Sequence, residues 1–213
     1  MKIKRFVFND IDVNSYLLWD EESLEAVIID PATFYPHEEE ELKEFVKQNG
    51  LRLTHSLNTH LHFDHVFGNA FIEKEFGLKS EAHDADWPWA ETIGERLARF
   101  GIRYTGKVPA LGRILNEGDT ITFGKYTIRV LHLPGHSPGS LGYYIPEENI
   151  IFAGDVLFQR SIGRTDFADS DHATLIKNIK EKLLILPNET VVYPGHGPST
   201  TIGEEKESNY YLQ

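Results

Sequence analysis

Four side chains that can bind a metal ion lie within one short segment. The stretch of six positions from 60 to 65 contains His60, His62, Asp64 and His65. In a strand, alternate residues point to the same side, so His60 and His62 would be directed to one spot. Asp64 and His65, on the turn that follows, would be directed to an adjacent spot. One segment could therefore serve two metal ions.

Three further candidate ligands follow, each directly after a glycine: His136, Asp155 and His196. Neutral imidazole and carboxylate suit zinc or iron, and a site with open coordination positions leaves room for water. The alternative is that these are scattered polar residues without a common role. The high density of candidate ligands at positions 60–65, together with the three candidates further along the chain, favours a hydrolytic metal site.

The first half of the chain predicts strands and helices in alternation. The first segment of ligands is expected on a loop between a strand and a helix. Apolar patterns predict strands at 3–8, 13–19, 26–30 and 53–57, a helix at about 36–48 ended by Gly50, and a helix at 67–76 ended by Gly77.

Residues 84–106 read as a helical excursion that contains Trp87, Trp89 and an amphipathic stretch, Ile93 to Phe100. These aromatic side chains could form a wall of the site, although structural packing is the favoured interpretation for both tryptophans.

From Arg113 onward, short strands between turn signals predict a second, meandering sheet. This arrangement puts His136 on a loop and Asp155 directly after the buried strand 150–153. A helix at 172–184 and a strand at 190–193 then lead to His196. Every candidate ligand thus lies at the end of a strand. With no repeat or linker, we expect one domain over residues 1–213, of mixed α/β class, with two sheets flanked by helices.

The same residues, in the same order, resemble the metal motifs of the metallo-β-lactamase-fold superfamily. The resemblance runs from Asp30-Pro31 to Pro194-Gly195-His196-Gly197. It implies a four-layer αββα sandwich. The stretches Gly154–Phe158 and Ser161–Phe167 are similar to those of glyoxalase-II-like hydrolases and also of persulfide dioxygenases.

The resemblance also implies a division of the ligands. The first metal would be held by His60, His62 and His136, the second by Asp64, His65 and His196, with the carboxylate of Asp155 as a bridge. The cofactor would be two divalent ions, Zn²⁺ above all, with iron or manganese as alternatives. In such sites the metals lie about 3.5–4 Å apart and lower the pKa of bound water to about 7. Asp64 and Asp155, with a metal-bound hydroxide, are the predicted catalytic groups.

A small-molecule acyl thioester is the predicted substrate, because a thiol with a pKa of about 8.5 leaves as thiolate without a strong general acid. An iron-dependent persulfide dioxygenase is the alternative from another enzyme class, since two histidines and one carboxylate suffice for iron and O₂. Lactonases and cysteine-free β-lactamases share the same ligands. The segment Pro194–Pro198 resembles the hydrolases more than the dioxygenases.

Arg164 lies nine positions after Asp155, where glyoxalase II enzymes have a basic residue that contacts glutathione. Two positions later those enzymes have a tyrosine, whereas this chain has Asp166. The helical glutathione-binding domain of that family is also not expected, since the chain ends 17 residues after His196 (213 − 196). A salt bridge from Arg164 to Asp166 or Asp169 is an equally weighted interpretation.

Composition excludes several classes of protein. With no cysteine, the chain has neither a disulfide nor a nucleophilic thiol, which also excludes relatives whose second metal is bound by cysteine. A net charge of −12 disfavours nucleic acid as a partner. No long apolar run or signal-peptide pattern is present, so neither membrane insertion nor export is expected and a cytoplasmic location is the default.

The remaining histidines are expected to have no role in the chemistry, with the possible exception of His132. Either His132 or Thr59 could hydrogen-bond to a ligand imidazole. The others in this group are His37, His55, His83 and His172. The acidic tail from Glu204 to Tyr211 could cap the fold, cover the site or join a dimer, and the sequence sets no oligomeric state.

Overall fold

The computed structural model describes residues 1–99, 101, 104 and 108–213. Within this part of the chain, six strands form the first sheet in their order along the sequence. The strands β1, β2 and β3 pair antiparallel, whereas β3 to β6 are parallel. Their bounds are β1 (Lys2–Phe8), β2 (Val13–Trp19), β3 (Glu25–Ile29), β4 (Arg52–Leu57), β5 (Ser80–Ala82) and β6 (Arg113–Ile114).

The second sheet has the order β14-β13-β10-β9-β8-β7. An antiparallel meander from β7 to β10 is followed by a crossover that makes β13 parallel to β10. The strands are β7 (Thr120–Phe123), β8 (Tyr126–His132), β9 (Leu141–Ile145), β10 (Ile150–Gly154), β13 (Val191–Pro194) and β14 (Thr200–Thr201), and a small hairpin pairs β11 (Leu157–Phe158) with β12 (Ser161–Ile162).

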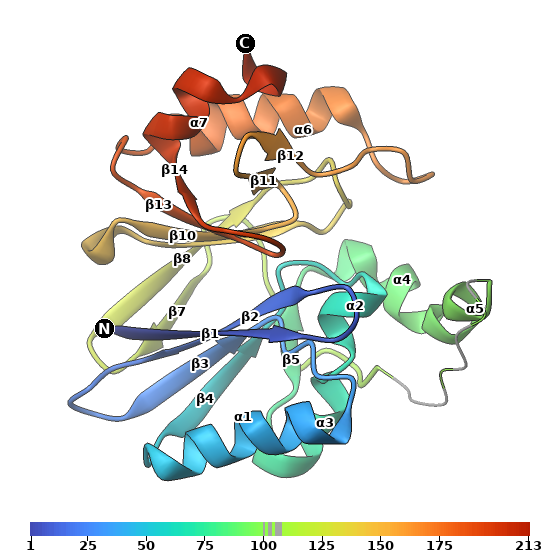
Figure 1. Cartoon of the computed structure of the whole chain (residues 1–213), viewed down its shortest axis with the longest axis vertical. Coiled ribbons are helices and arrows are strands. Elements are labelled where there is room, and N and C mark those ends of the chain that lie inside the picture. Colours follow the sequence, from blue (N-terminus) through green and yellow to red (C-terminus); the bar gives the residue numbers. More distant parts are fainter. Residues whose placement is uncertain (100, 102–103, 105–107) are drawn as a thin grey trace.

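Helices cover the outer face of each sheet, as Figure 1 shows. The first sheet is covered by α1 (Pro36–Gln48) and α3 (Asn69–Phe76), and the second by α6 (His172–Asn178), the π-helical turn η3 (Ile179–Leu183) and α7 (Ile202–Ser208). Between the sheets lies an apolar core that includes Tyr16, Phe123 and Phe152. This arrangement confirms the predicted αββα sandwich.

The local patterns explain these elements. In α1, Leu42 and Val46 are buried one turn apart, and Gly50 follows the helix with a positive φ of 63°. The strand β10 is buried along its whole length because it lies between β9 and β13 and has neighbours on both faces.

Three sequence predictions need correction. The helix expected at 67–76 begins at Asn69, and a separate short helix, α2 (Phe63–Val66), precedes it. The break lies at Gly68, where a Cβ would be 2.5 Å from the main-chain oxygen of Pro31. The helix expected at 172–184 changes to a π-helical turn after Asn178. The strand at Arg113 was expected in the second sheet but pairs with β5 in the first.

The helical excursion consists of η1 (Asp84–Asp86), α4 (Trp87–Glu91) and α5 (Ile93–Ala98). The rest of the predicted stretch, including Phe100, lies largely outside the described residues. The acidic tail forms α7 and η4 (Tyr210–Leu212). Elsewhere in the chain, the short 3-10 turn η2 (Pro146–Glu148) connects β9 to β10. Buried Glu205 of α7 accepts hydrogen bonds from Thr200 and Asn209, so the tail caps the second sheet. None of the described helices is long and apolar enough to cross a bilayer.

Candidate metal centre

The seven predicted ligands come together at one edge of the sandwich, where strands from both sheets end. His60 and His62 lie on the loop after β4. Asp64 and His65 lie in α2 rather than on that loop, because the chain turns into a helix at Phe63. The other three ligands, His136, Asp155 and His196, follow β8, β10 and β13 of the second sheet.

A first cluster is formed by His60, His62 and His136, whose ligand atoms all lie within 4.8 Å of one another. Nδ1 of His62 is 3.0 Å from Nε2 of His136. All three side chains are buried. Three imidazoles in this arrangement match the ligand type and number of a catalytic zinc site with an open position.

A second cluster is formed by Asp64, His65 and His196. Oδ2 of Asp64 is 3.4 Å from Nε2 of His196 and 3.7 Å from Nε2 of His65. Each cluster therefore combines residues from the first sheet with a histidine from the second.

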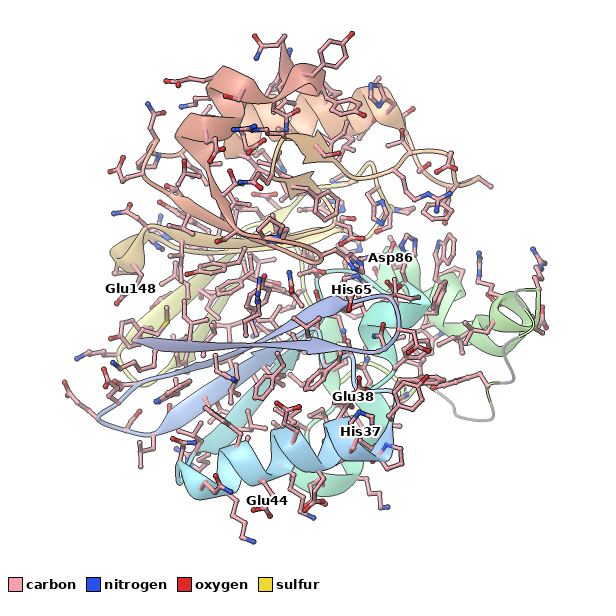
Figure 2. The ribbon with its side chains drawn as sticks, in the orientation of Figure 1. His37, Glu38, Glu44, His65, Asp86 and Glu148 are labelled. Carbon is pink, nitrogen blue, oxygen red and sulfur yellow. The ribbon has the colours of Figure 1, made fainter. Side chains whose placement is uncertain are left out.

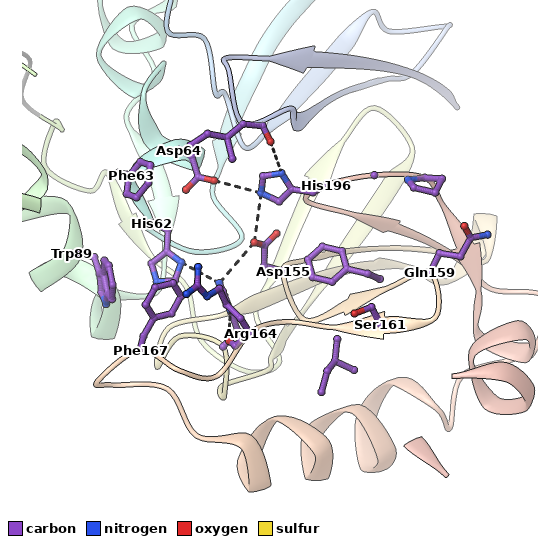
Figure 3. Close-up of a pocket in the computed structure, with 16 residues that line it drawn as sticks. His62, Phe63, Asp64, Trp89, Asp155, Gln159, Ser161, Arg164, Phe167 and His196 are labelled. Atoms are coloured by element: carbon purple, nitrogen blue, oxygen red, sulfur yellow. Dashed lines mark hydrogen bonds and ion pairs between the residues drawn. The ribbon is translucent and has the colours of Figure 1, made fainter. Parts of the chain in front are cut away.

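Asp155 lies between His62 of the first cluster and His196 of the second (Figure 3). Its Oδ1 is 3.6 Å from Nε2 of His65, and its Oδ2 is 3.8 Å from Nε2 of His136 and 3.6 Å from Nε2 of His196. A carboxylate that faces both clusters has the position expected of a bridging ligand between two cations. The chain passes close by at Gly195, where a Cβ would be only 2.2 Å from Oδ1 of Asp155.

Hydrogen bonds fix the orientation of four imidazoles through their Nδ1 atoms. His65 donates to Oδ2 of Asp30 at 3.1 Å, and His60 donates to Oγ1 of Thr59 at 3.1 Å. Thr59 in turn donates to the same Asp30 oxygen at 2.7 Å. His136 donates to the main-chain oxygen of Arg164 and His196 to that of Ile11. With Nδ1 occupied, each of these rings in its neutral form has its Nε2 lone pair directed at a cluster.

The sequence analysis predicted the role of Thr59 but missed Asp30. Asp30 directly follows a buried strand, and its main chain has a positive φ of 49°. An acidic residue directly after a predicted buried strand was the feature of the sequence that could have identified Asp30. The alternative, His132, is not at the site: it stacks on His83 and pairs with the main-chain oxygen of Pro138.

Burial and neighbouring charges shift the pKa values of the clustered groups in opposite directions. Burial lowers the pKa of His60 well below its ordinary value and that of His62 to about 3, with repulsion from other imidazoles adding to both effects. Burial also disfavours the charged form of His65, yet Asp64, Asp155 and Asp30 raise its pKa well above the usual range. The pKa of Asp155 is held low by His65 and His196 despite its burial.

The clusters fit a pair of cations by one structural criterion. Nε2 of His60, Nε2 of His65 and Oδ1 of Asp155 are buried and have no hydrogen-bond partner among the described residues. Buried polar atoms are almost always paired, because leaving one unpaired costs about 1–3 kcal/mol. Since all three atoms face the same small region, a bound cation would satisfy them together.

A cavity of about 800 Å³ opens above the clusters. Both clusters contribute to its floor, and its walls are mainly aromatic and aliphatic. Beyond the ligands, its lining residues are Ile11, Phe63, Trp89, Phe158, Gln159, Ser161, Ile162, Arg164, Phe167, Gly197 and Pro198. The volume and apolar lining are typical of a small-molecule site.

The two tryptophans have different roles. Trp89 is 8% exposed and its ring lies 4.2 Å from that of His62, so it forms part of the wall and the favoured packing interpretation was incomplete for this residue. Its Nε1 donates to Asp169 and the guanidinium of Arg96 lies over its ring. Trp87 packs in the apolar cluster around α2, α4 and α5 instead.

Arg164 lines the cavity but is not free. Its guanidinium makes two hydrogen bonds of 2.7 Å to Asp166 and lies 4.5 Å from the ring of Phe167. The structure thus contains the predicted salt bridge to Asp166 at the position predicted to contact substrate.

The fold and the two clusters define a class of metal-dependent enzymes. The chain matches the metallo-beta-lactamase superfamily over residues 9–196 and belongs to it. This match covers most of the chain, including all seven candidate ligands.

Curated relatives have several activities. Hydroxyacylglutathione hydrolase GloC of Haemophilus influenzae is 38% identical over 200 residues, which cover 93% of this chain and 92% of that protein. Probable metallo-hydrolase YqgX of Bacillus subtilis is 35% identical over 100% of this chain and 98% of its own. Mitochondrial persulfide dioxygenase ETHE1 of Mus musculus is 32% identical over 92% of this chain and 69% of its own.

Solved structures agree with this family. BLEG-1 B3 metallo-beta-lactamase has a TM-score of 0.89 and 37% identity, with 100% of both chains covered. TTHA1623 in a di-iron-bound form has a TM-score of 0.86 and 38% identity, over 98% of this chain and 100% of that one.

Proposed function

We propose that this protein is a dinuclear zinc hydrolase that cleaves small-molecule acyl thioesters, as a glyoxalase-II-like enzyme does. The observation that carries the proposal is the position of Asp155 between two complete ligand clusters on the floor of one apolar cavity. Two divalent ions bound there would activate water near neutral pH and polarise an acyl carbonyl.

The side chains of the protein supply the remaining functions. The pKa values of Asp64 and Asp155 are lowered by neighbouring imidazoles in spite of burial, so both are ionised at neutral pH and can accept a proton released by water. The Nδ1 hydrogen bonds hold the ligand rings in fixed orientations. Phe63, Trp89 and Phe167 line the cavity and exclude bulk water from the bound acyl group.

A thioester suits this site better than an oxygen ester or an amide. A thiol with a pKa near 8.5 can leave as thiolate, so no strong general acid is needed at the leaving atom. The similarity to hydroxyacylglutathione hydrolase GloC supports the same substrate class.

A persulfide dioxygenase is the second candidate, supported by the similarity to ETHE1 and by the di-iron form of TTHA1623. A non-haem iron oxygenase needs only two histidines and one carboxylate. Here the second cluster of Asp64, His65 and His196 is present as well, which favours the hydrolase.

The test begins with elemental analysis of protein purified without added metal. About two zinc ions per chain, with turnover of S-lactoylglutathione or another thioester but not of a lactone or a β-lactam, would support the proposal. Asp155→Asn should then lose at least about 100-fold in kcat/KM, whereas His37→Ala, on the exposed side of α1, should retain it. One iron per chain with persulfide-dependent oxygen uptake would contradict the proposal.

A further inference from the structure

Asp86 is a fully buried carboxylate to which the proposed chemistry assigns no role. It ends η1 and directly precedes α4, close to the edge of the sandwich where the ligands gather (Figure 2). Its side chain has 0% exposure. A carboxylate at such depth must be satisfied by donors, because burying it unpaired is costly.

Three donors satisfy Asp86. Oδ2 accepts from the main-chain nitrogen of Leu61 at 3.2 Å and from Oγ of Ser137 at 2.7 Å. Oδ1 accepts from the main-chain nitrogen of Gly139 at 2.6 Å. Hydrogen bonds to an ionised carboxylate are shorter and stronger than those between neutral groups.

These donors belong to the two segments that carry the first cluster. Leu61 lies between His60 and His62, and Ser137 directly follows His136. One side chain therefore joins the loop after β4, from the first sheet, to the loop after β8, from the second. Within the part of the chain that the structure describes, neither oxygen of Asp86 forms a hydrogen bond with a residue of the second cluster.

The loop after β8 packs closely around this carboxylate. At Gly139 a Cβ would be 2.7 Å from Cγ of Asp86, so a side chain there would push the carboxylate away. The hydroxyls of Ser137 and Ser140 are 2.8 Å apart, which keeps the second loop compact around the same point. The helix that follows Asp86 also carries Trp89 to its place against the ring of His62.

We propose that Asp86 is a positioning residue that sets the spacing between His60, His62 and His136 and thereby the zinc affinity of the first cluster alone. Coordination geometry depends on the groups that hold the ligands, and loss of such a group typically weakens metal binding 10–100-fold. The inference rests on the proposed metal centre but not on thioester chemistry.

The test measures zinc affinity of the full-length protein by competition with a chromogenic chelator, in two backgrounds. His196→Ala removes a ligand of the second cluster and leaves the first intact, and His136→Ala does the reverse. Adding Asp86→Asn should weaken zinc binding about 10–100-fold in the first background. In the second background it should change the affinity less than about twofold.

Glu205→Gln is the matched control. Glu205 is also 0% exposed and accepts three hydrogen bonds, from Arg160, Thr200 and Asn209, but its donors flank no ligand of the first cluster. It should leave zinc affinity unchanged in both backgrounds. Equal loss in both backgrounds after Asp86→Asn, or no loss in either, would overturn the inference.

Ser137→Ala provides a milder variant if Asp86→Asn does not fold. It removes one of the three donors, and the same asymmetry between backgrounds is expected with a smaller loss. Because zinc binding is measured without substrate, the asymmetry would support the role of Asp86 even if no thioester were hydrolysed. Normal thioester turnover with symmetric zinc loss would refute only the role of Asp86.

Discussion

Asp30 and His65 are hydrogen-bonded, with Oδ2 of Asp30 3.1 Å from Nδ1 of His65. The bond fixes which ring nitrogen carries the proton, because a carboxylate can only accept. The same oxygen accepts from Thr59, whose hydroxyl accepts from His60. One carboxylate therefore controls the tautomer of a ligand in each cluster.

Asp30→Asn should weaken zinc binding about 10–100-fold. An amide nitrogen placed against His65 would favour the tautomer that carries its proton on Nε2, which cannot then bind a cation. Chelator competition would measure the loss. Asp20→Asn, at an equally buried carboxylate in the turn after β2, is the control. Unchanged affinity in Asp30→Asn would show that the bond does not set the tautomer.

Gly195→Ala should abolish binding of at least one zinc ion. The added Cβ would be 2.2 Å from Oδ1 of Asp155 and 2.7 Å from Cε1 of His65, so one of these ligands must move. Gly197→Ala, in the same loop, is the control: its φ of 72° makes alanine strained, but its Cβ would meet nothing within 4 Å. Elemental analysis would separate the two variants, and equal metal content in both would contradict the steric explanation.

Asp166→Asn should lower the KM for S-lactoylglutathione, because the guanidinium of Arg164 would lose its ion pair and one of its two hydrogen bonds to residue 166. Arg164→Ala should raise the same KM by less than about tenfold, since an exposed and already paired charge contributes little. The main-chain bond from His136 to Arg164 is unaffected by either change. Steady-state kinetics would test this, and an unchanged KM in both variants would exclude Arg164 from substrate binding.

The metal-free protein should be most stable near pH 6.5. Below this pH the unfolded chain protonates all its imidazoles, whereas folding keeps His60 and His62 neutral because their pKa values are lowered, that of His62 to about 3. Stability therefore falls as the pH is lowered. Above pH 6.5 the folded chain retains protons on His65 and His196, whose pKa values are raised, and stability falls as the pH rises through those values.

Thermal unfolding in EDTA between pH 5 and 9 would measure this profile. Saturating zinc should remove the decline on the alkaline side, because the cation replaces the protons on His65 and His196. A metal-free unfolding temperature that kept rising from pH 6.5 to 8.5 would contradict the prediction.

The sequence predicted the parts of the fold that have a strong local pattern. The strands β1 and β2 and the helix α1 lie at or within one residue of their predicted ranges, and the candidate ligands follow strands. The two-residue strand β6 has no period to detect, so its sheet could be known only from its pairing with β5. That residues 1–213 form one domain remains a prediction.

The residues around the ligands were harder to predict. Asp86 lies 51 positions before its partner Ser137, and Trp89 lies 80 positions before Asp169. A single sequence shows local spacing but not which distant segments meet, so the partners of these two residues became known only from the tertiary structure. Asp30 is missed for the same reason, since its partner His65 lies 35 positions away.

Each ligand cluster includes residues from the first sheet and a histidine from the second. A bound cation would therefore cross-link the two halves of the sandwich. Its contribution to the free energy of unfolding would grow with the logarithm of the free metal concentration. The lifetime of this protein in a cell would then depend on metal supply, so that metal starvation would reduce the amount of enzyme as well as its activity.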